Sequence, residues 1–235
     1  MKTSVLTAAA MAALVLVGHA SADHIWINEF HYDNTGTDTG EFVEVGLRTP
    51  NASGFNASDY SILLYNGGST AATAAAATVY DTKSLSTATA SAPIPIAGST
   101  STITLYTLSY PSNGVQNGAP DGIALVNVTS GLVEEFLSYE GVMTANTGTP
   151  AAGVTSTDVG VLEPGDALGT SLGATGTGIG ANQFGPSSYA LLTTATPGAI
   201  NIGQTFAAPG DPVPEPASMA LVGLAGLGLL RRRRA

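Results

Sequence analysis

The sequence predicts an all-β protein built as an antiparallel β-sandwich. Only 10% of the residues are charged, and the chain is rich in Gly, Ala, Ser and Thr, which suits a turn-rich β protein better than a helical one. Short stretches of alternating apolar and polar residues recur along the chain, separated by Gly, Asn and Pro. No convincing 3.6-residue periodicity interrupts this series, so the pattern favours a sandwich.

The first two predicted strands form a hairpin-like pair. Alternation runs through residues 24–30 and again through Glu41–Val45. The connection between them, residues 33–40, is rich in the Asp, Asn, Gly and Thr that turns need, although it is long for a tight hairpin. Further strands are predicted at Tyr60–Tyr65, Thr102–Leu108, Ile123–Val128, Leu132–Ser138 and Ser188–Leu192.

The segment Ser69–Ser101 is unusually rich in Ala and Thr, which is typical of a low-complexity insertion. Within it, residues 71–77 are predicted to form a surface loop rather than a helix. Gly67 and Gly68 precede these residues, and threonines are interspersed among the alanines.

The charge distribution excludes nucleic acid as a partner. All seventeen acidic residues lie between Asp23 and Glu215, and five of the seven basic residues lie in the terminal segments. Only Arg48 and Lys83 oppose the acidic residues, so the middle of the chain repels phosphate backbones and favours cations. The absence of Cys removes disulfides, thiol nucleophiles and zinc sites of the cysteine type.

Residues 1–22 have the order of a secretory signal peptide. A positively charged start at Met1-Lys2 is followed by an almost wholly apolar run over Val5–Val17. Ala20 and Ala22 then form the small-residue site that a signal peptidase cleaves. A retained membrane anchor is disfavoured because the apolar run is short and the cleavage site is present.

The opposite end of the chain is predicted to hold the protein in a membrane. A Pro/Ala-rich linker over residues 207–213 is followed by an apolar helix over residues 217–230. At about 1.5 Å per residue this helix covers about 21 Å, less than the roughly 30 Å of a bilayer core, so it is a marginal span. By the positive-inside rule the arginines after it stay cytoplasmic, which places the residues from Asp23 onward outside. These arginines are Arg231, Arg232, Arg233 and Arg234.

Residues 214–235 resemble the PEP-CTERM sorting signal of Gram-negative bacteria, because Pro214, Glu215 and Pro216 precede the apolar helix and the arginines. The resemblance implies recognition by an exosortase, a membrane transpeptidase with a catalytic cysteine. It also implies transient anchorage in the inner membrane, cleavage, and delivery to the cell envelope or to the extracellular polysaccharide matrix. A simple tail anchor would use the same helix and arginines without needing the Pro-Glu-Pro.

Five segments of the region 23–206 share features with a known family: Ile27–Asn34 with Asp38, Gly40–Val45, Asp121–Val126, Phe136–Gly141 and Thr196–Asn201. Through them the region resembles the lamin-tail domains of bacterial surface proteins and nuclear lamins. The resemblance implies an immunoglobulin-like antiparallel β-sandwich. The sequence departs from the family where Asp59-Tyr60 replaces its usual Gly-Trp pair, and in the insertion from Ser69.

The densest polar cluster in the sequence is not predicted to be catalytic. Glu29, His31 and Asp33 share one face of a strand, which permits an acid–base or metal site. Carboxylates on the solvated side of a hairpin explain the same residues without catalysis, and no Ser-His-Asp pattern follows. The sequence therefore predicts no enzyme, no catalytic residue and no cofactor-binding residue.

Calcium binding is a better functional candidate for these residues than catalysis. Asp33, Asn34, Asp38 and Glu41 provide hard oxygen atoms within one loop, although their spacing does not match an EF-hand. The second acidic group, Glu134-Glu135 with Glu140, is interpreted as a solvated strand edge that discourages aggregation.

The leading functional hypothesis is an exported, non-catalytic structural or adhesive protein of the cell surface or biofilm matrix. The alternative is a module that binds calcium or extracellular polysaccharide. An extracellular hydrolase is the third and least favoured class.

Overall fold

The structure is a computed structural model that describes residues 24–49, 54–165, 169–179 and 184–208. The predicted signal peptide with Ala20 and Ala22, the motif Pro214–Pro216, the apolar helix over 217–230 and the arginine cluster lie outside these ranges. Within these ranges, no helix is long and apolar enough to cross a membrane.

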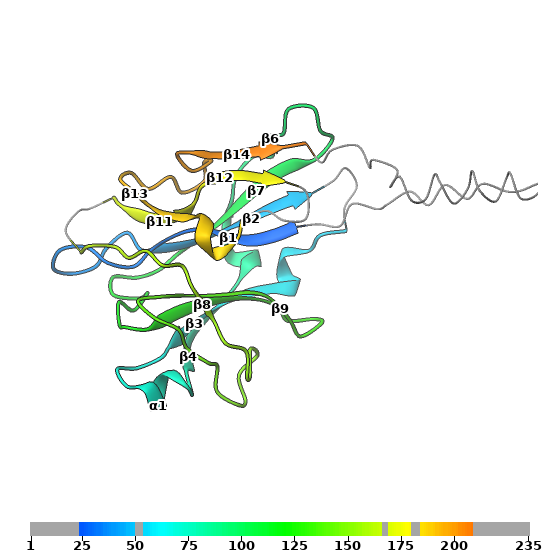
Figure 1. Cartoon of the computed structure of the whole chain (residues 1–235). Helices are drawn as coiled ribbons and strands as arrows, with labels where there is room; N and C mark the ends of the chain where they lie inside the picture. Colours follow the sequence, from blue (N-terminus) through cyan, green and yellow to red (C-terminus); the bar gives the residue numbers. More distant parts are fainter. Residues whose placement is uncertain (1–23, 50–53, 166–168, 180–183, 209–235) are drawn as a thin grey trace, which may run out of the picture.

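The described chain consists mostly of β-strands in antiparallel sheets, which confirms the predicted all-β class (Figure 1). The first sheet has the order β13-β11-β1-β2-β7-β5, and β6 also pairs with β7. Its strands are β1 (His24–His31), β2 (Phe42–Thr49), β5 (Thr89–Ala90), β6 (Ile94–Pro95), β7 (Thr102–Ser109), β11 (Ser171–Ala174) and β13 (Tyr189–Leu192).

The second sheet has the order β10-β9-β8-β3-β4, and all of its pairs except β10–β9 are antiparallel. Its strands are β3 (Tyr60–Asn66), β4 (Thr78–Ser84), β8 (Asp121–Asn127), β9 (Leu132–Tyr139) and β10 (Thr157–Asp158). The predicted β1–β2 pair is confirmed, and the five further predicted strands occur with ends that differ by at most two residues.

The main core lies between the two sheets because each strand alternates its side chains between two faces. On β2, Val43 and Val45 face the same cluster as Phe30 of β1. The second sheet contributes Ile62 and Leu125 to this cluster, and all five side chains are fully buried.

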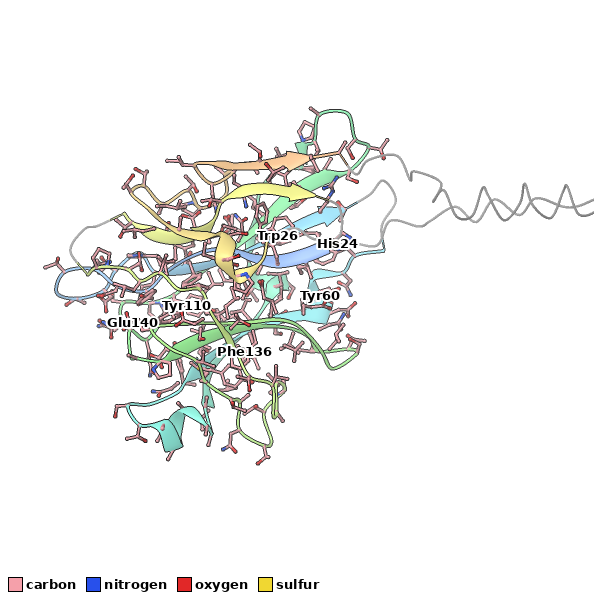
Figure 2. The ribbon with its side chains drawn as sticks, viewed as in Figure 1. His24, Trp26, Tyr60, Tyr110, Phe136 and Glu140 are labelled. Atoms are coloured by element: carbon pink, nitrogen blue, oxygen red, sulfur yellow. The ribbon has the colours of Figure 1, made fainter. Side chains whose placement is uncertain are left out.

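A third layer covers the other face of the first sheet. It consists of β12 (Gly176–Ile179) and β14 (Gln204–Ala207), which pair in parallel above β1 and β2 (Figure 1). Trp26 of β1, labelled in Figure 2, packs against this layer. Its ring centroid lies 5.7 Å from that of Phe184 and 5.9 Å from that of Phe206. Both faces of β1 and β2 are therefore buried, including the face expected to be solvated.

A second apolar cluster packs on the outer side of the second sheet. The rings of Tyr65 and Phe136 pack there at an interplanar angle of 49°, with centroids 4.8 Å apart. Met143 and Ala151 cover them from the segment after β9. Three short 3-10 helices occur elsewhere in the described chain, at Ala57–Asp59, Leu85–Thr87 and Pro186–Ser188.

The expectation of a loop over residues 71–77 is wrong at its beginning, where α1 spans Ala71–Ala74. The side chain of Thr70 accepts a hydrogen bond from the backbone of Thr73, and the Thr73 side chain bonds back to Thr70. The interspersed threonines, which argued against a helix, therefore form a capping box that begins one.

The segment 69–101 is also more than a low-complexity insertion. Its strand β4 forms an edge of the second sheet, and its strands β5 and β6 pair with β7 of the first sheet. Leu85, between β4 and β5, is fully buried in the main core. The Ala- and Thr-rich composition of the segment as a whole concealed these strands, although β4 itself contains Val79 and Tyr80.

Candidate functional site

The polar cluster predicted from the sequence lies in the interior, so its assignment to a solvated hairpin face is wrong. Glu29 and Glu44 are 0% exposed, Glu41 is 1% exposed and His31 is 3% exposed. The segment at residues 196–201 covers Glu29 and Glu44, whereas the loops that carry Glu163 and residues 114–115 cover His31 and Glu41. Segments distant in sequence supply their hydrogen-bond partners, which the local pattern does not reveal.

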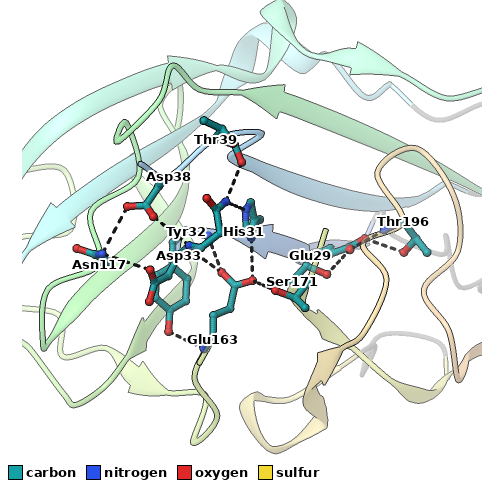
Figure 3. A network of polar contacts seen from close by, with 12 residues as sticks. Glu29, His31, Tyr32, Asp33, Asp38, Thr39, Asn117, Glu163, Ser171 and Thr196 are labelled. Atoms are coloured by element: carbon teal, nitrogen blue, oxygen red, sulfur yellow. Dashed lines mark hydrogen bonds and ion pairs between the residues drawn. The ribbon is translucent and has the colours of Figure 1, made fainter. Parts of the chain in front are cut away.

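His31 and Glu163 form the centre of one buried network (Figure 3). His31 Nδ1 lies 2.8 Å from Glu163 Oε1, and the other carboxylate oxygen accepts the backbone N–H groups of Tyr32 at 2.7 Å and Asp33 at 3.1 Å. Asn34 Nδ2 donates to His31 Nε2 at 2.7 Å, which assigns the proton of a neutral imidazole to Nδ1. Both ring nitrogens are therefore engaged within the protein.

The pKa and the hydrogen bonds of His31 indicate a structural role, as the partner of Glu163. Burial lowers the pKa of the imidazole, but the hydrogen bond and charge of Glu163 raise it more, so the net pKa is above its usual value. Because the ring is buried and both nitrogens are occupied, it has no free proton or lone pair to offer a substrate. The sequence does not indicate a role for Glu163, because no strand pattern surrounds this residue.

A second network joins Glu29 to the turn at residues 196–201, called the closing turn below. Glu29 accepts hydrogen bonds from the Thr196 N–H, the Thr196 hydroxyl and the Ser171 hydroxyl. Burial raises the pKa of Glu29, while these hydrogen bonds oppose the rise.

Glu44 holds the same closing turn from the neighbouring strand. Its Oε2 accepts the backbone N–H of Gly198 at 2.5 Å and the hydroxyl of Thr107 at 2.7 Å, and its Oε1 accepts Asn28 Nδ2 at 2.9 Å. Burial raises its pKa to about 7 despite these donors. Glu29, Glu44 and the closing turn together form what we call the carboxylate latch.

Amide side chains extend the latch to the last described strand. Asn201 Nδ2 donates to the carbonyl oxygens of Asn28 and Ala174, both at 3.0 Å. Gln204 Nε2, at the start of β14, donates to Asn28 Oδ1 at 2.7 Å. The latch therefore fixes the strand that leads to the C-terminal segment.

The four residues of the predicted calcium site are only partly brought together. Asp33 Oδ1 and Asp38 Oδ2 both lie near Asn117 Nδ2, at 3.5 and 3.4 Å, and Asn34 N–H donates to Asp38 Oδ1 at 3.0 Å. Glu41 instead accepts the N–H groups of Gly114 and Val115. In the described part of the chain, no three His, Asp or Glu side chains are grouped to hold a metal ion.

The second acidic group is interpreted from its sequence as one solvated strand edge. This holds for Glu134, which is exposed, but not for Glu135 and Glu140. Glu135 Oε2 accepts the backbone N–H of Ile27 at 2.7 Å, so its side chain links the two sheets. Burial raises the pKa of Glu135 to about 8. Glu140 Oε1 accepts the hydroxyl of Tyr32 at 3.1 Å.

Comparison with protein families matches residues 212–234 to the PEP-CTERM protein-sorting motif. The match includes Pro214, Glu215, Pro216 and the four arginines, so the predicted sorting motif is confirmed. No curated protein and no solved structure matches the chain. The motif implies recognition by an exosortase, membrane-anchored processing in a Gram-negative bacterium, and sorting to the cell surface.

Proposed function

We propose that this chain is a non-catalytic structural or adhesive protein of the cell envelope or extracellular matrix, delivered there by its sorting motif. The carboxylate latch is the observation that carries this proposal. Its buried acidic side chains bind backbone N–H groups and hydroxyls of the protein itself, as Glu29 and Glu44 bind the closing turn. Such carboxylates stabilise a fold and are not accessible to a substrate.

The lamin-tail resemblance belongs to the same proposal. Segments that carry it, far apart in sequence, contact one another: Glu29 bonds Thr196, Glu44 bonds Gly198, and Asn28 bonds Asn201. A motif whose polar residues bind each other across the domain is typical of residues that specify a fold. We infer an immunoglobulin-like sandwich of the lamin-tail type from these contacts.

The proposed route begins with cleavage by signal peptidase after Ala22. The apolar helix over residues 217–230 then holds the chain in the inner membrane until the exosortase acts at Pro214–Pro216. Extracellular polysaccharide is the proposed neighbour of the released protein, and the acidic composition excludes nucleic acid as a partner.

Intact mass spectrometry of the protein from cells with and without the exosortase tests this route. We expect the mature protein to lack residues 1–22 and the arginine cluster in competent cells, and to retain the arginine cluster in cells without the exosortase. The variant Glu215→Ala is a matched control that should keep its tail in both strains. An intact arginine tail on mature protein from competent cells would overturn the sorting route.

The structural role has a separate test in the cells that display the protein. Deleting the gene should reduce matrix cohesion or surface adhesion, and a chain carrying His31→Gln should restore it if the variant is displayed at the wild-type level. A hydrolase instead predicts a measurable turnover of matrix polysaccharide that His31→Ala abolishes. That result would replace the structural role with a catalytic one.

Calcium binding is the second candidate function, favoured by one observation. Asn34 is 2% exposed, and its Oδ1 has no hydrogen-bond partner among the described residues. This oxygen belongs to the same loop as the carboxylates of Asp33 and Asp38, which share one amide donor at long distances. A hard cation with additional water ligands would satisfy these oxygen atoms.

A further inference from the structure

A polar cleft of about 490 Å³ lies where β4, the edge strand of the second sheet, comes close to β7 of the first sheet. This β4–β7 cleft is lined by residues 82–84, 87, 89 and 107–109. Its volume falls within the range of about 300–1,000 Å³ that is typical of ligand sites. Of the described residues that line it, Leu108 alone is apolar, and Leu108 is buried. The cleft therefore suits a polar ligand.

Lys83 supplies the positive charge of the cleft. Its ammonium donates to the carbonyl oxygen of Ser109 and lies 3.9 Å from the centroid of the Tyr110 ring. No carboxylate oxygen of the described residues lies within 4.0 Å of this ammonium. An ammonium has three N–H donors and Ser109 takes one of them, so Lys83 can still bind an anion. Arg48, the other Lys or Arg in the part of the chain that the structure describes, is buried.

Free hydroxyl groups from three strands line the same cleft. Thr82 of β4, Thr89 of β5 and Ser109 of β7 are all exposed. Their hydroxyls form no hydrogen bond with another described residue. The other hydroxyls of the lining bond within the protein, as Thr107 does to Glu44. A ligand that carries hydroxyl groups can therefore exchange hydrogen bonds with the three free ones.

The chemistry of the cleft fits an anionic sugar. Sugar hydroxyls both donate and accept, and a sugar carboxylate carries the single negative charge that one ammonium balances. The acidic composition of the chain opposes the approach of an anion. At physiological ionic strength, however, salt screens exposed charges more than about 8 Å apart, so Lys83 dominates within the cleft. Asp81, two residues before Lys83, is the acidic residue on the same face of β4.

We propose that the β4–β7 cleft binds a carboxylate-bearing sugar of an extracellular polysaccharide. The sugar carboxylate accepts a hydrogen bond from the Lys83 ammonium, and the sugar hydroxyls bond Thr82, Thr89 and Ser109. This inference rests on the proposed function, in which extracellular polysaccharide is the neighbour of the released protein, and it names the site and the class of sugar. A lysine on an edge strand can also serve only to discourage pairing with another sheet, a role that needs no free hydroxyls.

Isothermal titration calorimetry on the full chain tests the site, using detergent-purified protein from cells without the exosortase. The probe is tetragalacturonate, a linear chain of carboxylate-bearing sugars, and maltotetraose is its neutral counterpart. EDTA in the buffer prevents calcium from bridging the probe to the loop around Asp38. We expect Lys83→Gln to weaken tetragalacturonate binding by about tenfold or more, because it removes a charge-assisted hydrogen bond. Asp81→Asn should strengthen binding by about twofold, because it removes a negative charge from the same face of β4.

Two threonines of β4 provide a matched pair of variants. Thr82→Val removes one of the free hydroxyls and should weaken binding by about threefold. Thr78 is also exposed but does not line the cleft, so Thr78→Val should leave binding unchanged. A thermal melt followed by the fluorescence of Trp26, the single Trp of the chain, shows that each variant is folded. If Lys83→Gln does not fold, Thr82→Val and Asp81→Asn decide, and unchanged binding in both would overturn the site.

Equal affinity of the parent and of Lys83→Gln for tetragalacturonate would overturn the proposed site, as would maltotetraose that binds as tightly as the charged probe. A parent protein that binds neither sugar would overturn it too. These results would leave the structural role standing, because matrix cohesion and adhesion in the deletion strain test that role separately. Oligomers formed by Lys83→Gln with unchanged sugar binding would assign Lys83 to protection of the β4 edge instead.

Discussion

Glu29 receives two hydrogen bonds from Thr196, one from the backbone N–H and one from the hydroxyl, both 2.8 Å long. These residues are 167 positions apart. A turn near the C-terminal end of the described domain therefore contacts β1, the first strand of the fold. The turn precedes β14, and β14 precedes the sorting motif at residues 212–234. The latch can therefore close only when the chain is present as far as the closing turn at residues 196–201.

Replacing Glu29 with Ala should strongly destabilise the protein. The change leaves the partly buried N–H of Thr196 without an acceptor and opens a cavity beside the buried Ser171. We expect a loss of about 2–4 kcal/mol in the free energy of unfolding, measured by urea denaturation. Glu134→Ala, at an exposed position of β9, should change it by less than about 0.5 kcal/mol. Equal losses in the two variants would show that Glu29 does not hold the closing turn.

Local patterns in the sequence predicted the strands but not the environment of their polar residues. In Glu41–Val45 the side chain of Glu44 lies on the opposite face of the strand from those of Val43 and Val45. One face of such an alternating strand is usually solvated. Here a third layer covers that face. The partners Thr196, Gly198 and Glu163 come from segments whose packing no local pattern encodes.

The same limit explains the incomplete calcium site. Proximity in sequence grouped Glu41 with Asp33, Asn34 and Asp38. Glu41 directly precedes β2, however, and its carboxylate accepts hydrogen bonds from the loop at 114–115. Asn117, which lies near both aspartates, comes from the same distant loop. A stretch of Asn and Gly such as residues 113–118 predicts turns and does not indicate which loop those turns will contact.

The protein should be more stable at pH 5.5 than at pH 8.5. Burial raises the pKa of Glu44 to about 7 and that of Glu135 to about 8, above the value near 4.5 expected in the unfolded chain. The folded state therefore binds more protons between these values, so stability is fully present below about pH 4.5 and is lost as the pH rises through 7–8. The raised pKa of His31 acts in the same direction.

Urea denaturation at a series of pH values measures this loss, which we expect to be on the order of a few kcal/mol between pH 5.5 and 8.5. The variant Glu135→Gln keeps the size of the side chain and removes its titration, so the dependence on pH should become shallower. Stability that rises from pH 5.5 to pH 8.5 would contradict the assigned directions.

If the loop around Asp38 binds calcium, millimolar Ca²⁺ should raise the melting temperature and EDTA should reverse the rise. Asp38→Asn removes a charge but keeps an oxygen atom, and should reduce the shift. Mg²⁺ at the same concentration provides a control for ionic strength and should have a smaller effect. A melt that Ca²⁺ and EDTA leave unchanged would count against the second candidate function.

Gly46→Ala should disrupt the third layer while leaving the two main sheets with their own core. A Cβ atom at residue 46 would lie 2.2 Å from Trp26 Cζ2, far inside any permitted contact, so the indole must move away from Phe184 and Phe206. We expect the free energy of unfolding to fall by about 2–3 kcal/mol because of the overpacking. The fluorescence emission of Trp26 should shift to the red, because the displaced ring becomes more exposed to water. Gly54→Ala introduces the same methyl group where no atom lies within 4 Å, and should leave both measurements unchanged. Since Trp26 Nε1 also donates to Asn28 Oδ1, displacement of the ring should weaken the latch as well. An unchanged emission spectrum in Gly46→Ala would show that Trp26 does not occupy the space above Gly46.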